Sequence, residues 1–386
     1  MAANKRTFRL KDLYAVRTLS GVTAAPDGRL AAFVAGRPDA KNNKTQSEIW
    51  VWEKGRGEHQ VTFDGKAMMP RFSPRGERLA YLSDRVGEKQ QAYVMALGLS
   101  EGRRVTNFES GAVSFEWSPD GRRLAVIAKA DKTPAEKKKE SDKLDAWVYD
   151  QDEPRQQLFV VSAGGSGKPR RVSLAAEHVG SVAWFPDGRR LAYASCPLGQ
   201  LDSQWYQSVL KVAGADGRGR RTICRFLGHT IGARFFISPD GRQALLMEAL
   251  DRRNLWHDAA KVVLLATGRK RPVTVRFDLA SMNPQWLGAG RVLFETGAGT
   301  TCAFYAGRAG ARPRMVVGGP GVAAFPVVAE KAGRVFFIYS EAGRPDELHA
   351  APLDGSAPPV SLTKVNRGLS ALRLAAPRAI NGKVKR

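Results

Sequence analysis

Apolar residues recur along the chain in short runs, and a polar turn stands before many of them. The runs include "RLAAFVA" (29–35), "RLAVIA" (123–128) and "RLAYAS" (190–195). Runs of this length, rich in β-branched and aromatic residues and bounded by turn residues, predict strands buried between stacked sheets. The pattern therefore indicates an all-β fold.

The turn before these runs has a mechanism that can be read from its residues. Pro presets φ for the first central position, Asp accepts a local backbone hydrogen bond, and Gly takes the positive φ that closes the turn. Its copies end at Gly28, Gly76, Gly121, Gly188 and Gly241, and two weaker copies end at Gly290 and Gly333. An aromatic residue often stands four positions earlier, and we expect this set to be core: Phe72, Trp117, Trp184 and Trp286.

The spacing of the turn glycines predicts the architecture. Successive intervals are 48, 45, 67, 53, 49 and 43 residues, and a period in the forties with strands inside it is typical of a propeller. Each turn joins a strand A to a strand B, and two further strand-like runs, C and D, follow. Seven such units predict a seven-bladed β-propeller of four-stranded antiparallel blades; the alternative is an open β-solenoid.

The repeats also divide the chain. Residues 1–18 are a lead-in segment, residues 19–366 the propeller, and residues 367–386 a C-terminal linker. A repeat fold explains how 386 residues avoid one oversized core, because each unit packs only on its neighbours. The first and last units contain no strand from the opposite end of the chain. We therefore expect the ring to close by packing and not by a shared strand.

The longest connections predict where binding occurs. In a four-stranded blade, the A–B and C–D turns lie on one face, and the B–C and D–A connections lie on the other. The long connections are all B–C: 36–47, 129–155, 196–207 and 250–260. Long irregular loops on a rigid scaffold favour function, although we expect 131–145 to be a solvated, mobile insert. Candidate contact residues in these loops are Asp202, Gln204, Trp205, Tyr206, Trp147, Tyr149 and Trp256.

No sequence match to a catalytic motif lies in the structural context that the motif requires. "GLSEG" (98–102) fits G-x-S-x-G but occupies a C–D hairpin turn, where no helix follows. "AGGSGKPR" (163–170) resembles a phosphate loop, yet Pro169 follows Lys168 where Ser or Thr is needed. The histidines lie at no metal-ligand spacing. We expect no catalytic residue, metal or cofactor on this chain.

Net charge and cysteine content indicate which partners and which cellular compartment to expect. The net charge of +24 suggests an acidic partner. However, the arginines are spread in pairs beside turns and do not form one block, so we expect a solvated surface and no nucleic-acid partner. Three widely spaced cysteines indicate reduced thiols in the cytoplasm. No run of about 18 apolar residues predicts a membrane span.

The sequence resembles the N-terminal propeller of prolyl oligopeptidase-family serine peptidases, in particular the acylaminoacyl-peptidase and dipeptidyl-peptidase-like enzymes. The resemblance rests on the opening "RLKDLYAVRTLSGVTAAPDGRLAAFV", the repeated "SPDGRRLA" and "RRVTNF", and the Lys/Glu-rich insert that ends in "YDQDEPRQQLFVV". It covers essentially the whole chain. TolB-like propellers contain the same repeated sequence motifs.

The resemblance implies a role for the chain. In the family an α/β-hydrolase domain carries the Ser, Asp and His triad, and no position of this sequence matches that triad. The propeller would then gate and select peptide or acyl-peptide substrates for the hydrolase. The glutamate pair that grips a free amino terminus in dipeptidyl peptidases has no clear match. Two alternatives are a stand-alone TolB-like protein-binding platform and a propeller enzyme with its own site in the channel.

Overall fold

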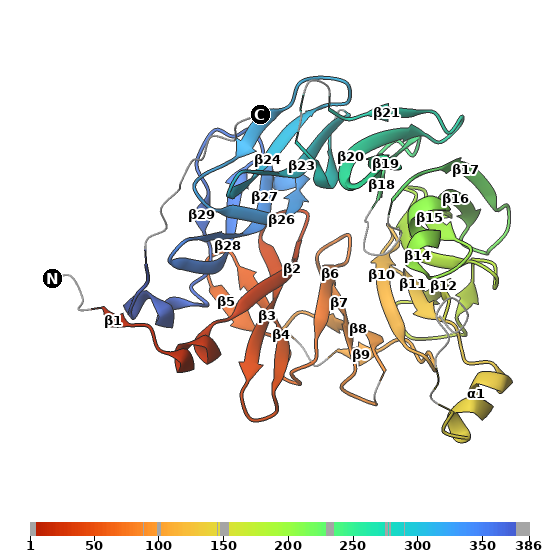
Figure 1. The fold of residues 1–386 in the computed structure, drawn as a ribbon, viewed down its shortest axis with the longest axis horizontal. Coiled ribbons are helices and arrows are strands. Elements are labelled where there is room, and N and C mark those ends of the chain that lie inside the picture. The colour runs from red at the N-terminus through yellow and green to blue at the C-terminus, as the bar shows by residue number, and fades with distance from the viewer. Residues whose placement is uncertain are drawn as a thin grey trace.

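The computed structural model describes residues 5–87, 89–98, 102–144, 146, 154–228, 235–274, 277, 279–288 and 290–375. Nearly all regular structure in these residues is β-strand (Figure 1). The helical segments are η1 (Leu10–Ala15), α1 (Pro134–Ser141), α2 (Leu201–Tyr206), η2 (Glu330–Ala332) and η3 (Arg367–Ala371). None of the described helices is long and apolar enough to cross a membrane.

The strands follow the predicted order A, B, C, D in every unit. The A strands are β2 (Thr18–Ala24), β6 (Met68–Phe72), β10 (Ala112–Trp117), β14 (His178–Trp184), β18 (Phe236–Ile237), β22 (Met282–Leu287) and β26 (Val322–Ala329). The B strands are β3 (Leu30–Asp39), β7 (Arg78–Ser83), β11 (Arg123–Lys129), β15 (Arg190–Cys196), β19 (Gln243–Asp251), β23 (Arg291–Ala298) and β27 (Arg334–Glu341). The C strands are β4 (Lys44–Glu53), β8 (Gln91–Ala96), β12 (Gln156–Ser162), β16 (Val209–Gly214), β20 (Asn254–Leu264), β24 (Thr301–Arg308) and β28 (Arg344–Pro352). The D strands are β5 (Gly57–Gln60), β9 (Arg103–Arg104), β13 (Arg170–Arg171), β17 (Arg221–Arg225), β21 (Lys270–Pro272), β25 (Arg314–Val317) and β29 (Val360–Ser361).

These strands form antiparallel sheets in which each strand pairs with its neighbour in sequence. The first five units are separate four-stranded sheets, and the last two share one eight-stranded sheet. Within that sheet, β22–β25 and β26–β29 are linked by the parallel pair Cys302 and Val322. The sheets follow one another around a central axis (Figure 1). The all-β class with four-stranded antiparallel units is confirmed.

The A–B turn has the predicted chemistry. In the third unit, the Gly121 N–H donates to the Ser118 carbonyl oxygen at 2.8 Å, and Gly121 has φ of 69°. Asp120 Oδ1 accepts the backbone N–H of Arg122 at 3.0 Å. The Ser118 hydroxyl closes the turn by accepting the Arg123 N–H at 2.9 Å. The turn is therefore a local structure that the sequence determines.

The recurring aromatic residue joins neighbouring sheets. Trp117 and Trp184 are buried, as predicted. The Trp117 indole N–H donates to the Arg71 carbonyl oxygen in the preceding unit at 3.0 Å, and the Trp184 indole bonds Glu116 in the same way at 3.1 Å. The aromatic position therefore packs between sheets and also satisfies a backbone carbonyl of the preceding sheet.

The first and last units close the arrangement by packing, as expected. Leu19 and Phe33 of the first unit share an apolar core with Phe336 and Leu348 of the last. The sequence did not predict a further contact outside the blades. There, β1 (Arg6–Thr7) runs parallel to β30 (Leu372–Arg373). The lead-in segment therefore pairs with residues 362–375, which follow the last sheet and which we call the exit segment.

Candidate functional site

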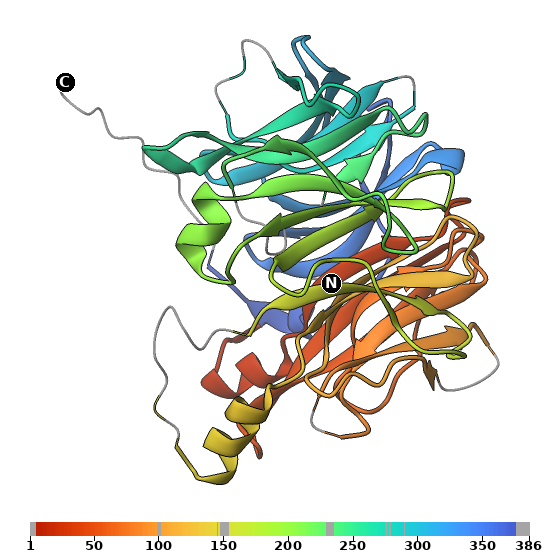
Figure 2. The same cartoon turned by 90° about the vertical axis from the view of Figure 1, so that its right-hand side faces the viewer.

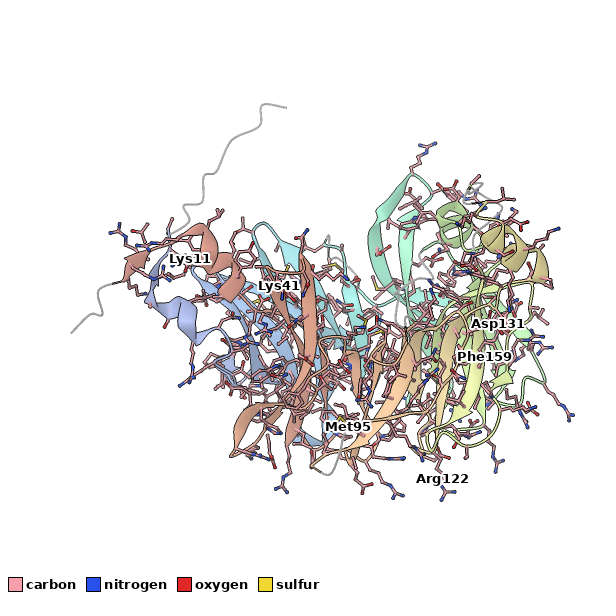
Figure 3. All side chains as sticks on the ribbon, turned by 90° about the horizontal axis from the view of Figure 1, so that it is seen from below. Lys11, Lys41, Met95, Arg122, Asp131 and Phe159 are labelled. Carbon is pink, nitrogen blue, oxygen red and sulfur yellow. The ribbon has the colours of Figure 1, made fainter. Side chains whose placement is uncertain are left out.

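The long B–C connections lie on one face of the molecule, as predicted. Figure 3 shows Lys41 and Asp131, from two B–C connections, on one side, and Arg122, from an A–B turn, on the opposite side. We call the side that carries the B–C and D–A connections the B–C face. The helical segments η1, α1 and α2 line this same face (Figure 2).

All four predicted loops contain regular structure. Residues 36–47 extend β3 and β4 as a paired hairpin in which Asp39 faces Lys44. Residues 250–260 form the β19–β20 hairpin, whose last pair is Asp251 and Asn254. Residues 196–207 contain α2. Backbone pairing beyond the sheet core has no clear apolar signal, which explains why the pattern indicated loops.

The solvated insert at 131–145 contains a short helix. The Thr133 hydroxyl caps α1 by accepting the Glu136 N–H at 3.2 Å, and the Glu136 carboxylate accepts the Thr133 N–H at 2.6 Å. No residue of α1 is buried. The predicted solvation is therefore observed for this helix, and the capping box explains why it forms.

The candidate contact residues are not equivalent in the structure. Trp205 and Gln204 are 4% and 1% exposed, so their side chains pack beneath the surface instead of projecting from it. Tyr206 is 40% exposed, and the Arg252 guanidinium lies 6.0 Å from its ring centroid. Asp202 is exposed in the first turn of α2. Trp147 and Tyr149 lie outside the described residues, as does the Trp256 side chain.

The B–C face gathers exposed apolar side chains, a feature that the sequence analysis missed. Among the described residues, every exposed large apolar side chain except those of Met315, Phe325 and Val360 lies on this face. The set is Phe8, Leu10, Leu13, Tyr14, Phe63, Val86, Leu144, Leu174, Leu201, Tyr206, Leu250, Met282, Val322 and Leu374. Contiguous exposed apolar surface is typical of interaction sites, so this face is the candidate interaction surface.

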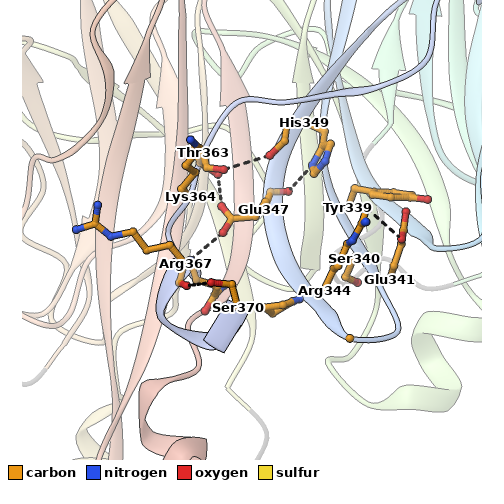
Figure 4. Close-up of a pocket in the computed structure, with 14 residues that line it drawn as sticks. Tyr339, Ser340, Glu341, Arg344, Glu347, His349, Thr363, Lys364, Arg367 and Ser370 are labelled. Atoms are coloured by element: carbon orange, nitrogen blue, oxygen red, sulfur yellow. Dashed lines mark hydrogen bonds and ion pairs between the residues drawn. The ribbon is translucent and has the colours of Figure 1, made fainter. Parts of the chain in front are cut away.

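A pocket of about 410 Å³ opens on the last unit at the B–C face (Figure 4). Its wall contains the Tyr339 and His349 rings, whose centroids are 5.2 Å apart. Arg344, Lys364 and Arg367 add three cationic side chains to the lining. Burial lowers the pKa of His349. Glu341 and Glu347 add two carboxylates, and Arg344 Nη1 lies 3.6 Å from Glu341 Oε2, so the lining has mixed charge beside an aromatic surface.

One side of this pocket is fixed by Glu347. Its carboxylate accepts the Thr363 hydroxyl at 2.5 Å (Figure 4). It also accepts the backbone N–H groups of Val365 and Asn366 at 2.9 and 2.8 Å. His349 Nδ1 faces the Glu347 carbonyl oxygen at 3.1 Å. Among the described lining residues, no serine hydroxyl is hydrogen-bonded to His349. The arrangement therefore orders the exit segment and provides no serine–histidine pair.

The same exit segment is hydrogen-bonded to the lead-in segment. The buried Asn366 side chain accepts the Arg17 N–H and donates to the Arg17 carbonyl oxygen, both at 2.9 Å. Asp346 Oδ2 accepts the Leu19 N–H at 3.3 Å. Because β2 begins and β29 ends on the B–C face, both segments leave the sheets beside this pocket.

The axis of the molecule contains a smaller cavity of about 110 Å³, lined by A-strand residues of five units, among them Gly21, Arg71 and Phe236. Beside it, the buried Glu295 carboxylate accepts Asn283 Nδ2 at 3.0 Å and the Phe325 N–H at 3.2 Å. Burial raises the pKa of Glu295.

The two weak motifs are turns where the structure describes them. Residues 163–169 connect β12 to β13 as a hairpin, so the phosphate-loop resemblance is not part of a strand–helix unit. Residues 99–101 of "GLSEG" lie outside the described part of the chain. In that described part, no group of His, Cys, Asp and Glu is placed to hold a metal ion.

The chain is similar to peptidases in sequence. No family model matches it. It is 28% identical over 207 residues to the uncharacterized peptidase YuxL of Bacillus subtilis, a match that covers 50% of this chain and 31% of that protein. The chain thus spans well under two thirds of that relative.

The fold is that of solved peptidase propellers. Acylaminoacyl peptidase of Pyrococcus horikoshii superposes on 93% of this chain with a TM-score of 0.70 and 16% identity, and the match covers 54% of that protein. The β-propeller domain of the Trilobed protease from Pyrococcus furiosus, described as having an open velcro topology, superposes on 91% of this chain with a TM-score of 0.64 and 16% identity, over 96% of its own length. The resemblance to the propeller domains of prolyl oligopeptidase-family peptidases, expected from the sequence, is confirmed.

Proposed function

We propose that this chain is the non-catalytic propeller of a serine peptidase and that it gates access to an α/β-hydrolase domain. The observation that carries the proposal is the collection of exposed apolar side chains on the B–C face. A docked domain would remove this surface from water, at roughly 25 cal/mol for each Å² of apolar area. Both ends of the sheet region leave on that face, so a domain joined to either end would begin beside it.

We also propose the finer architecture. Counting the two four-strand runs of the eight-stranded sheet as separate blades gives seven blades, in agreement with the seven turn glycines. The hydrolase would cover the B–C face, and peptides or acyl-peptides would be its substrates. The three free cysteines support reduced thiols in a cytoplasmic setting.

A gene-level experiment tests the proposal first. The DNA beyond the codon for Arg386 should continue in frame for roughly one more domain and encode G-x-S-x-G, then Asp, then His. A stop codon with no hydrolase gene nearby would instead favour the stand-alone platform.

A surface variant tests the docking face in the protein that contains the hydrolase. Leu201→Glu with Leu250→Glu places charges on the B–C face, and we expect hydrolysis of peptide nitroanilides to fall at least about tenfold, because a buried unpaired charge costs several kcal/mol. Met315→Glu is the matched control, since Met315 is comparably exposed but lies on a D strand. Equal activity in all three proteins would contradict the proposed docking face.

A further inference from the structure

The outer edges of five successive units hold much of the positive charge. The C–D turns and D strands of the second to sixth units contain fourteen Lys or Arg residues against two acidic residues, a net +12 out of the chain's +24. We call these segments the arginine belt; they are 97–104, 163–171, 215–225, 265–272 and 309–317. Half of the excess charge therefore lies in 45 residues of the sequence.

The fold places these clusters at equivalent positions in successive units, whereas along the chain they are scattered. Each unit contributes one cluster at the same position, on β9, β13, β17, β21 or β25. Each of these strands is the outermost of its four-strand run, and β9, β17 and β21 lie along the outer boundary in Figure 1. The expectation of no nucleic-acid partner rested on spacing along the chain, which does not reflect this arrangement.

Several belt arginines are exposed and form no ion pair with the described residues. They are Arg103, Arg170, Arg171 and Arg271. Arg314 is also exposed, and its charge helps to lower the pKa of Asp354. Others serve the fold: Arg104 Nε donates to the Thr106 carbonyl oxygen at 2.7 Å, and Arg220 Nη1 to that of Val172 at 3.1 Å. The exposed set includes residues from four of the five units.

The belt also contains a hollow of about 410 Å³ between the second and third units. One wall is 104–107, and the other includes the glycine-rich turn at 165–167. Arg104 lines this hollow. The Arg103 guanidinium lies close to Gly164 and Gly165 of the turn. A phosphate-sized anion in the hollow would therefore lie beside a cationic side chain.

Protection of sheet edges is the simplest explanation for charge on D strands, since charged edges prevent edge-to-edge pairing. That role requires charge of either sign. The belt has almost one sign only and is made mostly of arginine, whose fork matches phosphate oxygens. The described residues of the belt present no exposed aromatic side chain on which bases could stack.

We propose that the arginine belt binds the phosphate backbone of single-stranded nucleic acid without reading its sequence. A flexible strand can follow the curved outer rim, whereas a duplex resists bending. If each of the five clusters neutralises one phosphate, the logarithm of the affinity falls with the logarithm of salt concentration at a slope of about −3.5. Raising salt from about 50 to about 200 mM then weakens binding about a hundredfold.

Fluorescence anisotropy with a labelled oligo-dT of about 30 nucleotides tests the proposal on this chain, over a salt series. The triple variant Arg103→Glu, Arg170→Glu, Arg271→Glu should bind at least about tenfold more weakly, with a shallower salt slope. The edges of this variant remain charged, so a purely protective role predicts unchanged folding and no binding in either protein.

The matched control is Lys41→Glu, Lys44→Glu, Arg253→Glu, which changes the net charge equally on the B–C face. It should bind oligo-dT as the parent does. Three results overturn the proposal: no binding by the parent chain, equal weakening in both triple variants, or competition by polyglutamate as effective as unlabelled oligo-dT at equal charge. The last result would identify an acidic polypeptide as the partner. Because the assay needs no hydrolase, its outcome is independent of the proposed peptidase role.

Discussion

At the scale of single residues, His178 shows how burial changes chemistry. It begins β14, is 2% exposed, and its Nδ1 accepts the Gln156 N–H at 3.3 Å. Burial lowers its pKa to about 4, and the positive charge of Arg155 contributes in the same direction. The folded protein therefore holds this ring neutral at pH values where the unfolded chain protonates it.

This shift predicts acid sensitivity of the fold. The unfolded state binds the extra proton between its pKa of about 6.5 and the folded value, so stability falls as pH falls through that window. Between about pH 7.5 and about pH 5.5, His178 should account for about 1.4 kcal/mol of lost unfolding free energy. Urea unfolding of the parent and of His178→Gln at both pH values measures this difference. Equal pH dependence in the two proteins would show that His178 does not titrate in this way.

At the scale of elements, a side-chain clamp explains the recurring Thr or Ser of the D segment. In the second unit, the Thr106 hydroxyl accepts the Ala92 N–H and donates to Gln91 Oε1, both at 2.8 Å. In the last unit, Thr363 accepts the Leu348 N–H at 3.0 Å and donates to Glu347. The D strands are short, and the hydroxyl extends their attachment beyond the backbone ladder.

The clamp predicts that removing the Thr106 hydroxyl oxygen lowers the free energy of unfolding. Thr106→Val preserves shape but leaves the buried Ala92 N–H without its acceptor, so we expect a loss of about 2 kcal/mol in unfolding free energy. Thr106→Ser retains the hydroxyl and should lose less than half as much. Urea denaturation of the parent and the two variants measures these losses. Equal stability of the Val and Ser variants would contradict the clamp.

At the scale of the whole molecule, arginine side chains join one unit to the next. Arg123 Nη2 donates to the Gly188 carbonyl oxygen at 2.6 Å, and its guanidinium lies 5.1 Å from the Trp184 ring centroid. Arg78 makes the same contacts with Gly121 and Trp117. Part of the excess positive charge therefore holds neighbouring sheets together.

The adjacent arginine supplies a built-in control for this role. We expect Arg123→Ala to lower the unfolding free energy by about 1–2 kcal/mol, through loss of a charge-assisted hydrogen bond and a cation–π contact. Arg122→Ala removes an exposed side chain of the same turn and should change it by less than about 0.5 kcal/mol. Thermal and urea unfolding distinguish the two, and similar losses would mean that bulk charge matters more than the contact.

The sequence by itself determined the local structure and the repeat. Pro, Asp and Gly close the A–B turn through bonds within about five residues, and the apolar runs fix strand identity, so the four-strand units and their buried Trp117 and Trp184 could be predicted. Trp205 could not be placed, because an aromatic residue in a polar connection looks alike whether it is packed or exposed.

Only the tertiary structure decided which distant residues share a surface. The hydrogen bonds between Asn366 and Arg17 join segments from the two ends of the chain. The B–C face collects apolar side chains from every unit. The arginine belt gathers clusters that lie about one repeat apart in sequence. Such surfaces depend on how the units are placed around the axis, and packing between sheets sets that placement, whereas hydrogen bonds within each unit set the local structure.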